Sequence, residues 1–252
     1  MRSIDVLKGL ASKGNSFTLD DAAKINKVDR SSLKKMFLRM EKRGWIERIE
    51  KGKYLIIPLD AQKGKYTLNE FVIGSLLVNP NCIAYWSALN YYGFTEQIPG
   101  TVFIQTTSRK KKQDIEIFGV RYRIIRLKNE KFFGVRKEWI EGTQINITEK
   151  EKTLVDCLDK PYFCGGIVEV AKGLKTRDFD NKKLVRYARR LKNTGVIRRL
   201  GYLNELYSLG LKISRPDTRN YLLLDPSMSK KGFKSTRWRL IVNLNEKELE
   251  KI

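Results

Sequence analysis

Residues 18–58 contain two helix-start signals and one helix-end signal in direct succession. Thr18 precedes a short helical stretch and Asp21 follows three residues later, which is the spacing of a capping box with Asp in place of the usual Glu. Asp29 is placed to cap a second, longer helix, and Gly44 is placed to end it. The segment therefore predicts two helices joined by a short turn.

The longer helix is predicted to have one buried face and one basic face. Its apolar side chains recur at three- and four-residue spacing, so they form one stripe, which comprises Leu33, Met36, Phe37 and Met40. The side chains outside this stripe are polar or cationic: Arg30, Ser31, Ser32, Lys34, Lys35 and Arg39. A basic face opposite a buried stripe is suited to contact with a polyanion.

A hairpin is predicted directly after this helix. Two β-rich runs cover residues 45–49 and 53–57, and Gly52 between them can take the positive φ that a tight turn requires. Lys51 and Lys53 flank the tip of the hairpin. Helix, turn, basic helix and basic-tipped hairpin in this order predict a winged helix-turn-helix, whose second helix enters the DNA major groove.

The position of each polar residue in this arrangement suggests its role, because base contacts come mostly from the N-terminal part of the recognition helix. The predicted base-contacting residues are Arg30, Ser31 and Lys34, with Ser32 at the same end of the helix. The predicted phosphate-contacting residues are Lys35, Arg39, Lys51 and Lys53.

The net charge also indicates a polyanionic partner. The chain has 252 residues, with 51 Lys and Arg against 28 Asp and Glu, a formal charge of +23. Residues 1–63 carry 15 basic and 8 acidic side chains, a net +7, which leaves +16 for the remainder. The second part is therefore basic in its own right. Its predicted additional polyanion contacts are Arg109, Lys110, Lys111, Lys112, Arg198 and Arg199.

Several classes of chemistry are excluded by what the sequence lacks. It has no histidine, which excludes Ser-His and Cys-His catalytic pairs and most catalytic zinc sites. Its three cysteines form no CxxC pair and are expected to be free thiols. It also has no phosphate-cradling glycine motif. We therefore expect no catalytic residue, no metal and no cofactor, in a protein that is not an enzyme.

No uninterrupted apolar run approaches the ~18 residues that a membrane span requires. The amphipathic N-terminus lacks the apolar core of a signal peptide. We therefore expect a cytoplasmic protein without a membrane partner.

The polar stretch at residues 60–65 predicts a boundary between a winged helix-turn-helix domain at 1–63 and a larger mixed domain at 64–252. Helices are predicted at 68–78, 83–92, 148–158, 167–174, 182–191 and 196–208. Strands are predicted at 102–106, 115–118, 121–127, 132–139, 144–147, 221–224 and 238–242. Thr148, three residues before Glu151, is the predicted N-cap of the third of these helices. The predicted fold class is α/β, of the α+β type.

Three segments of the larger domain resemble a known family. They are IAYWSAL with YGFT and QIP at 83–99, TEKEKTLVDCLDKP at 148–161, and IRRLGYL at 197–203. In this order, after a winged helix, they are similar to AbiEi-type antitoxins over roughly residues 5–210. Within the segments, Trp86, Leu89, Thr153, Leu154, Leu200 and Leu203 are expected to belong to the core.

The resemblance implies an antitoxin of a type IV toxin-antitoxin system. Such a protein represses its own operon through the winged helix, on double-stranded operator DNA with inverted repeats. Its C-terminal domain counteracts a nucleotidyltransferase toxin encoded beside it, without forming a stable complex with that toxin.

Two other functions are open from the residues alone. One is a metal-dependent nuclease with a winged-helix targeting domain, in which Asp180 and Lys182 act with Asp114 or Glu116. The other is an RNA-binding protein that uses the basic run at 109–112 together with neighbouring aromatic side chains.

Overall fold

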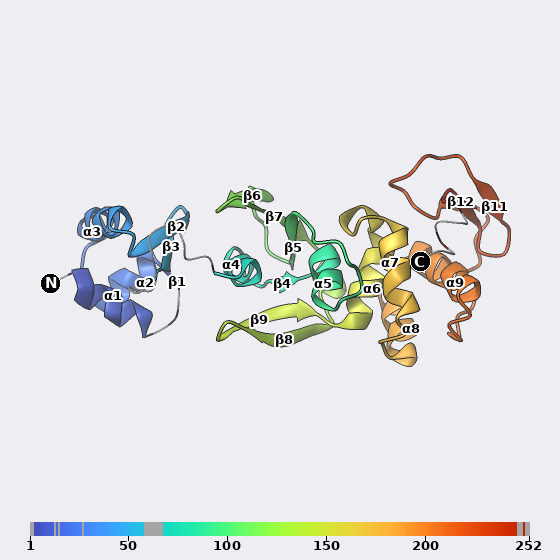
Figure 1. Ribbon diagram of the computed structural model, residues 1–252, viewed down its shortest axis with the longest axis horizontal. Helices are drawn as coiled ribbons and strands as arrows, with labels where there is room; N and C mark the ends of the chain where they lie inside the picture. Colours follow the sequence, from blue (N-terminus) through green and yellow to red (C-terminus); the bar gives the residue numbers. More distant parts are fainter. Residues whose placement is uncertain are drawn as a thin grey trace. The chain divides into compact units, whose positions relative to one another are not determined.

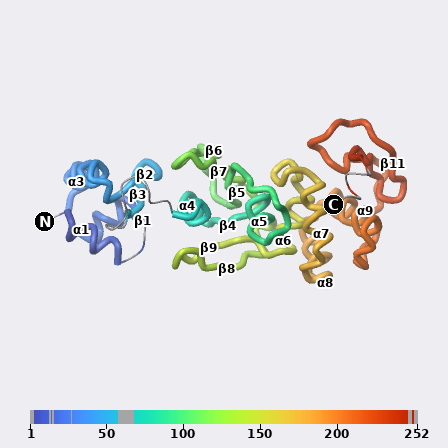
Figure 2. Tube along the Cα trace, viewed as in Figure 1, coloured from blue at the N-terminus to red at the C-terminus, as the bar shows by residue number. Residues whose placement is uncertain are grey.

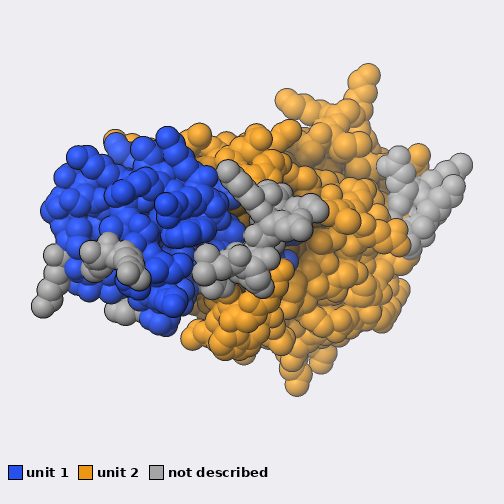
Figure 3. Space-filling model, turned by 60° about the vertical axis from the view of Figure 1, so that its left-hand side comes forward, with its two compact units in different colours: residues 1–70 blue, residues 71–252 orange. Residues whose placement is uncertain are grey.

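The computed structural model describes residues 3–12, 14, 16–26, 28–57, 68–245 and 249. The chain divides into two compact units, Met1–Glu70 and Phe71–Ile252 (Figure 3). The predicted boundary between residues 63 and 64 lies outside the described residues. Each unit has a hydrophobic core of its own.

Unit 1 combines three helices with a three-stranded antiparallel sheet of order β1-β3-β2 (Figures 1 and 2). Its elements are α1 Ser3–Ala11, β1 Ser16–Thr18, α2 Leu19–Asn26, α3 Arg30–Lys42, β2 Ile46–Glu50 and β3 Lys53–Ile56. This is the winged helix-turn-helix arrangement that the sequence predicts, with α3 as the second helix of the motif and the β2–β3 hairpin as the wing.

Both predicted helix caps of unit 1 are confirmed. The Thr18 amide donates to Asp21 Oδ2 at 2.8 Å, and the Asp21 amide donates back to Thr18 Oγ1 at 3.1 Å. Asp29 Oδ1 accepts from the Ser31 and Ser32 amides at 2.8 and 2.9 Å. These bonds satisfy first-turn N–H groups that have no partner within the helix, so they fix where α2 and α3 begin.

The predicted apolar stripe of α3 forms the centre of the unit 1 core. Leu33, Met36, Phe37 and Met40 are all buried. Phe37 meets Phe17 and Tyr54 edge to face, with ring centroids 5.2 and 5.0 Å apart. The core therefore fastens α3 to β1 and β3 and turns the opposite face of α3 outward.

Unit 2 contains a six-stranded mixed sheet of order β6-β7-β5-β4-β9-β8 (Figure 1). Its strands are β4 Cys82–Ile83, β5 Thr101–Thr106, β6 Asp114–Ile117, β7 Val120–Arg126, β8 Val135–Ile140 and β9 Thr143–Thr148. Strands β5 and β7 are parallel, as are β4 and β9, and the other neighbours are antiparallel. The mixed α/β fold class predicted from the sequence is confirmed.

The helices of unit 2 are α4 Glu70–Leu76, α5 Tyr85–Tyr91, α6 Lys150–Asp159, α7 Ile167–Lys175, α8 Asn181–Arg190 and α9 Thr194–Leu206. Helix α6 is central among them, because it contacts α5, α7, α8 and α9. Short 3-10 turns occupy Asn129–Lys131 and Pro161–Phe163, and a small sheet contains β10 Leu222–Leu223, β11 Phe233–Ser235 and β12 Leu240–Val242. Core positions expected in the three motifs are confirmed: Leu89, Thr153, Leu154, Leu200 and Leu203 are buried, and Trp86 is half-buried against them.

Two local predictions in unit 2 are wrong. The predicted helix at 83–92 starts later, because Cys82–Ile83 form strand β4 between β5 and β9. Thr148 is not the N-cap of α6; Glu149 holds that position, without a side-chain capping bond. Thr148 instead ends β9, and its hydroxyl lies 2.7 Å from the Thr153 hydroxyl inside the core.

We expect Phe37→Ala to lower the free energy of unfolding of unit 1 by about 3–5 kcal/mol, because it removes a buried ring between two other rings. Hydrogen exchange of peptides from α3 measures this opening separately from unit 2. The matched control is Leu38→Ala on the exposed face, expected to change stability by no more than about 0.5 kcal/mol. Equal effects of the two substitutions would contradict the assignment of the buried face.

Candidate nucleic-acid interface

The exposed face of α3 carries every α3 side chain predicted from the sequence to contact DNA. The exposed residues of this face are Arg30, Ser31, Ser32, Lys34, Lys35, Leu38 and Arg39. Leu38 is an apolar member of the set, and 56 % of its surface is accessible. The face therefore offers cations, hydroxyl groups and one apolar contact side by side.

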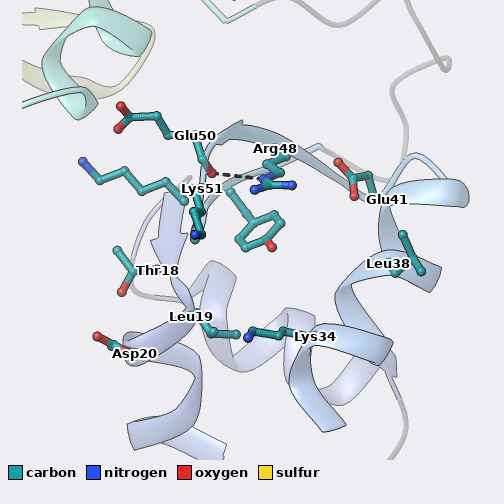
Figure 4. A pocket seen from close by; sticks show the side chains of 12 residues that line it. Thr18, Leu19, Asp20, Lys34, Leu38, Glu41, Arg48, Glu50 and Lys51 are labelled. Carbon is teal, nitrogen blue, oxygen red and sulfur yellow. Dashed lines mark hydrogen bonds between the residues drawn. The ribbon is translucent and has the colours of Figure 1, made fainter. Parts of the chain in front are cut away.

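A groove of about 650 Å³ separates α3 from the wing (Figure 4). We call it the α3–wing groove; its lining residues are Thr18, Leu19, Asp20, Lys34, Leu38, Glu41, Arg48, Glu50, Lys51, Gly52, Lys53 and Tyr54. Figure 4 shows Lys34 and Leu38 on the α3 wall and Arg48 on the wing wall. The groove thus joins the predicted recognition helix to both predicted wing lysines.

The charge of this groove is nearly balanced. Its cations are Lys34, Arg48, Lys51 and Lys53, and its carboxylates are Asp20, Glu41 and Glu50, so four positive charges face three negative ones. A uniformly cationic groove would attract any phosphate backbone, whereas base edges are recognised by individual donors, acceptors and methyl contacts. The mixed lining favours selective contact over indiscriminate attraction.

Arg30 forms an ion pair with Asp20, with Nη2 2.7 Å from Oδ1. Both side chains are more than half exposed. An exposed pair of this kind contributes only about 0–1 kcal/mol. Breaking this ion pair therefore costs little free energy, which leaves the Arg30 guanidinium able to bind other hydrogen-bond acceptors.

The first turn of α3 already has an anion bound to it, namely the Asp29 carboxylate. Hydrogen bonds from the Ser32 hydroxyl and amide, and then from Ser31, hold the pKa of Asp29 well below its usual range. The Ser31 and Ser32 amides are consequently engaged. These two amides are therefore not available to bind another anion at this end of α3.

Leu38 and Arg48 are among the groove residues that sequence reasoning missed. Leu38 lies four residues after Lys34, so its exposure could have been read from its place outside the apolar stripe. Arg48 is exposed on β2 next to an irregular register between Arg48 and Glu50, and its Nε donates to the Glu50 carbonyl at 3.4 Å. No local signal in the sequence shows that this strand position faces the groove.

The basic run of unit 2 is only partly open. Arg109, Lys111 and Lys112 are exposed, but the Lys110 ammonium donates to the Leu77 carbonyl at 2.5 Å. Arg109, Lys110 and Lys111 line a cavity of about 460 Å³ together with Arg126. Their role as an additional polyanion contact stays a prediction.

Arg198 and Arg199 do not form a polyanion contact, and that prediction is wrong. They are 1 % and 8 % exposed. The Arg199 guanidinium donates to the carbonyls of Leu158, Leu223 and Leu224 at 2.8, 3.1 and 2.9 Å. Arg198 donates to the Trp238 carbonyl at 3.0 Å and to the Asn220 carbonyl at 2.9 Å. A buried charge is costly unless it is hydrogen-bonded. Both guanidinium groups meet this requirement by donating to backbone carbonyl oxygens inside the fold.

Two residues of the nuclease alternative, Asp180 and Asp114, have structural roles. Asp180 is the N-cap of α8 and accepts from the Lys183 amide at 2.8 Å, and Asp114 pairs with Arg123 at 2.6 Å. In the part of the chain that the structure describes, no three acidic, cysteine or histidine side chains gather closely enough to hold a metal ion.

Among the described helices, none combines the length and apolar character needed to cross a bilayer.

Comparison with known proteins supports the resemblance for unit 1. Residues 6–57 match the family model described as "Transcriptional regulator, AbiEi antitoxin", so the predicted family resemblance is confirmed over this segment. No curated protein matches the chain. The crystal structure of the RV2827C protein from Mycobacterium tuberculosis has a similar fold, with a TM-score of 0.68 and 17 % identity over 99 % of this chain and 93 % of that chain.

We expect acid to weaken α3 through Asp29. Its folded-state pKa is depressed, so its contribution to stability is present above the unfolded value of about 3.9 and is lost as the pH falls below it. Asp29→Asn retains a capping side chain without the titration. Circular dichroism melts of both proteins should therefore differ most at about pH 7, and the difference should shrink steadily as the pH falls below about 4. A constant difference across this range would contradict the capping role of the carboxylate.

We expect Arg199→Ala to destabilise unit 2 by at least about 2 kcal/mol, because three buried carbonyls lose a charged donor. The measurement is urea denaturation followed by the near-ultraviolet signal. Arg121→Ala, which removes an exposed cation of the same unit, is the control and should leave the midpoint unchanged. Similar denaturation midpoints for both variants would contradict the buried structural role of Arg199.

Proposed function

We propose that unit 1 is a sequence-specific binder of double-stranded DNA that represses transcription. The observation that carries this proposal is the exposed face of α3 beside the wing, with Lys34 and Lys51 on one groove. The match of residues 6–57 to a family of transcriptional regulators supports it. In this fold such a helix enters the major groove while the wing contacts the neighbouring backbone.

The contacts are divided between base edges and phosphates. Arg30, Ser31 and Lys34 contact bases from the N-terminal half of α3, and Leu38 packs against a thymine methyl group, the apolar feature of the major groove. Lys35, Arg39, Lys51 and Lys53 contact phosphates and set the register of the protein on the duplex. Because the first-turn amides already hold Asp29, specificity depends on these side chains.

We further propose that the chain is the antitoxin of a type IV toxin-antitoxin system in the cytoplasm. In this function it represses its own operon at inverted repeats and counteracts a nucleotidyltransferase toxin without a stable complex, and it has no catalytic activity of its own. Support comes from the family match of unit 1 and from the three segments of unit 2 that resemble these antitoxins. Unit 2 carries the antitoxin activity, and unit 1 carries repression.

Binding of the full chain to a duplex from its own upstream region tests repression. The comparison is a scrambled duplex of equal length and composition, titrated across a salt series. We expect a preference of about a hundredfold or more for the upstream duplex at moderate salt. Equal and steeply salt-dependent binding to both would show that only the net charge attracts DNA.

Arg30→Ala is expected to lose about 1–3 kcal/mol of binding to the upstream duplex and little on the scrambled one, because a base contact is removed. Asp20→Asn is its matched control, since it breaks the same ion pair but keeps the guanidinium. Fluorescence anisotropy with both duplexes measures the two losses. If Asp20→Asn costs as much as Arg30→Ala, the pair supports the fold of unit 1 and reads no base.

Lys51→Ala is expected to weaken binding to both duplexes alike and to lower the slope of log K against log salt by about one, because one phosphate contact is lost. The same anisotropy titrations, repeated at several salt concentrations, measure the slope. A loss confined to the upstream duplex would assign Lys51 to base recognition instead.

The two proposed activities should separate by unit. A chain carrying Arg30→Ala with Lys34→Ala should lose repression of a reporter fused to its promoter. The same chain should still rescue cells that express the toxin gene beside it. Loss of rescue together with repression would contradict the assignment of antitoxin activity to unit 2.

A further inference from the structure

Unit 2 has a cavity of about 530 Å³ between α8 and the segment that follows α9. We call it the α8 pocket. Its rim contains Lys182, Arg186, Arg189 and Lys212, and its floor contains Val185 and Leu211. None of these residues belongs to the α3–wing groove or to the basic run at 109–112.

One wall of the pocket is a face of α8. Lys182, Arg186 and Arg189 are spaced by four and three residues, so they lie on one side of the helix and are exposed. The opposite side of α8, with Leu184 and Ala188, is buried in the core. Packing of this buried side against the core therefore fixes the orientation of α8 and keeps the three cations on its exposed side.

The other wall is fixed by Asn204 of α9. Its Oδ1 accepts from the Leu211 amide at 2.8 Å, and its Nδ2 donates to the Leu211 carbonyl at 3.1 Å. Gly210, with φ of +74°, makes the turn that places Leu211 next to the Asn204 side chain. Arg189 Nη2 lies 3.5 Å from the Lys212 carbonyl and links the two walls. The pocket is thus formed before any ligand enters.

The lining combines concentrated positive charge with an apolar floor. Among the described residues that line it, four are cationic and none is acidic. The carboxylate of Asp180, two residues before Lys182, is engaged with the Lys183 amide. Val185 and Leu211 are 8 % and 6 % exposed, so they offer a narrow apolar strip beneath the cations. A matching ligand is strongly anionic at one end and flat and apolar at the other.

We propose that the α8 pocket binds a nucleotide, with its phosphates on the cationic rim and its base over Val185 and Leu211. Guanidinium groups suit both parts, because they bind phosphate oxygens in pairs and stack on flat rings. The volume lies within the range of small-ligand pockets, about 300–1,000 Å³. The nucleotide can be free or the end of a single-stranded RNA, since both present the same chemistry. This site is independent of DNA binding by unit 1.

The test uses the full chain and a fluorescent N-methylanthraniloyl-ATP probe, followed by anisotropy. The site variant is Lys182→Gln with Arg186→Gln, which keeps the Arg189 link between the walls. The matched control is Lys230→Gln with Lys231→Gln, which removes the same charge from exposed positions of the same unit. We expect the site variant to weaken binding by about tenfold or more and the control to bind as the wild-type chain does.

Competition identifies the ligand. Unlabelled ATP and CTP should displace the probe better than inorganic triphosphate, because the base contacts the floor. A 5′-phosphorylated tetraribonucleotide that competes at lower concentration than ATP assigns the site to an RNA end, and the reverse order assigns it to a free nucleotide. The proposal is overturned if the wild-type chain does not bind the probe, if both variants lose binding equally, if triphosphate competes as well as ATP, or if a tetraglutamate peptide competes better. Unchanged thermal unfolding of the site variant shows that its loss is local.

Discussion

Unit 2 depends on a pair of opposite charges that has been taken out of water. Lys152 and Asp156, one turn apart on α6, are 0 % and 3 % exposed. Removing either partner would leave an uncompensated buried charge, which is among the costliest defects in a protein. Burial raises the pKa of the Asp156 carboxyl, and the Lys152 ammonium and the Gln105 amide oppose that shift. Because Gln105 belongs to β5 and donates to Asp156 at 2.6 Å, the network can be complete only when α6 lies against this strand.

The same requirement extends outward from α6 through Arg199. Its guanidinium donates to the carbonyl of Leu158, near the end of α6, and to those of Leu223 in strand β10 and Leu224 directly after it. The segments of unit 2 that resemble antitoxins therefore contain charged residues whose partners lie inside the fold. The sequence suggests that Arg198 and Arg199 form a polyanion site. In the structure they instead donate hydrogen bonds to backbone carbonyl oxygens that have no partner within a strand or helix. Similarity in these segments is therefore evidence of a shared architecture rather than direct evidence of a shared activity.

What the sequence could predict depends on how far apart the interacting groups are along the chain. The caps at Thr18 and Asp29 were predictable because each signal and its partner lie within three residues. The stripe of α3 was predictable because one helix repeat contains it. Arg199 was not, because its acceptors lie in distant segments, and the short strand β4 forms only through pairing with β5 and β9. Leu38 shows an intermediate case, since its exposure follows from the stripe but its place in a groove requires the wing.

A net charge of +23 gives the whole molecule an attraction for polyanions, but that attraction alone selects no site. Selection comes from the local arrangement. In the α3–wing groove, three carboxylates oppose four cations and Asp29 occupies the Ser31 and Ser32 amides of α3, so the groove as a whole has only a small excess of positive charge. In the α8 pocket, no carboxylate is present among the described lining residues to offset the four cations, and this excess of positive charge is the basis for the phosphate contacts proposed there. Under the functions proposed for them, the α3–wing groove recognises a DNA duplex and the α8 pocket holds a small anion, although both belong to the same basic chain.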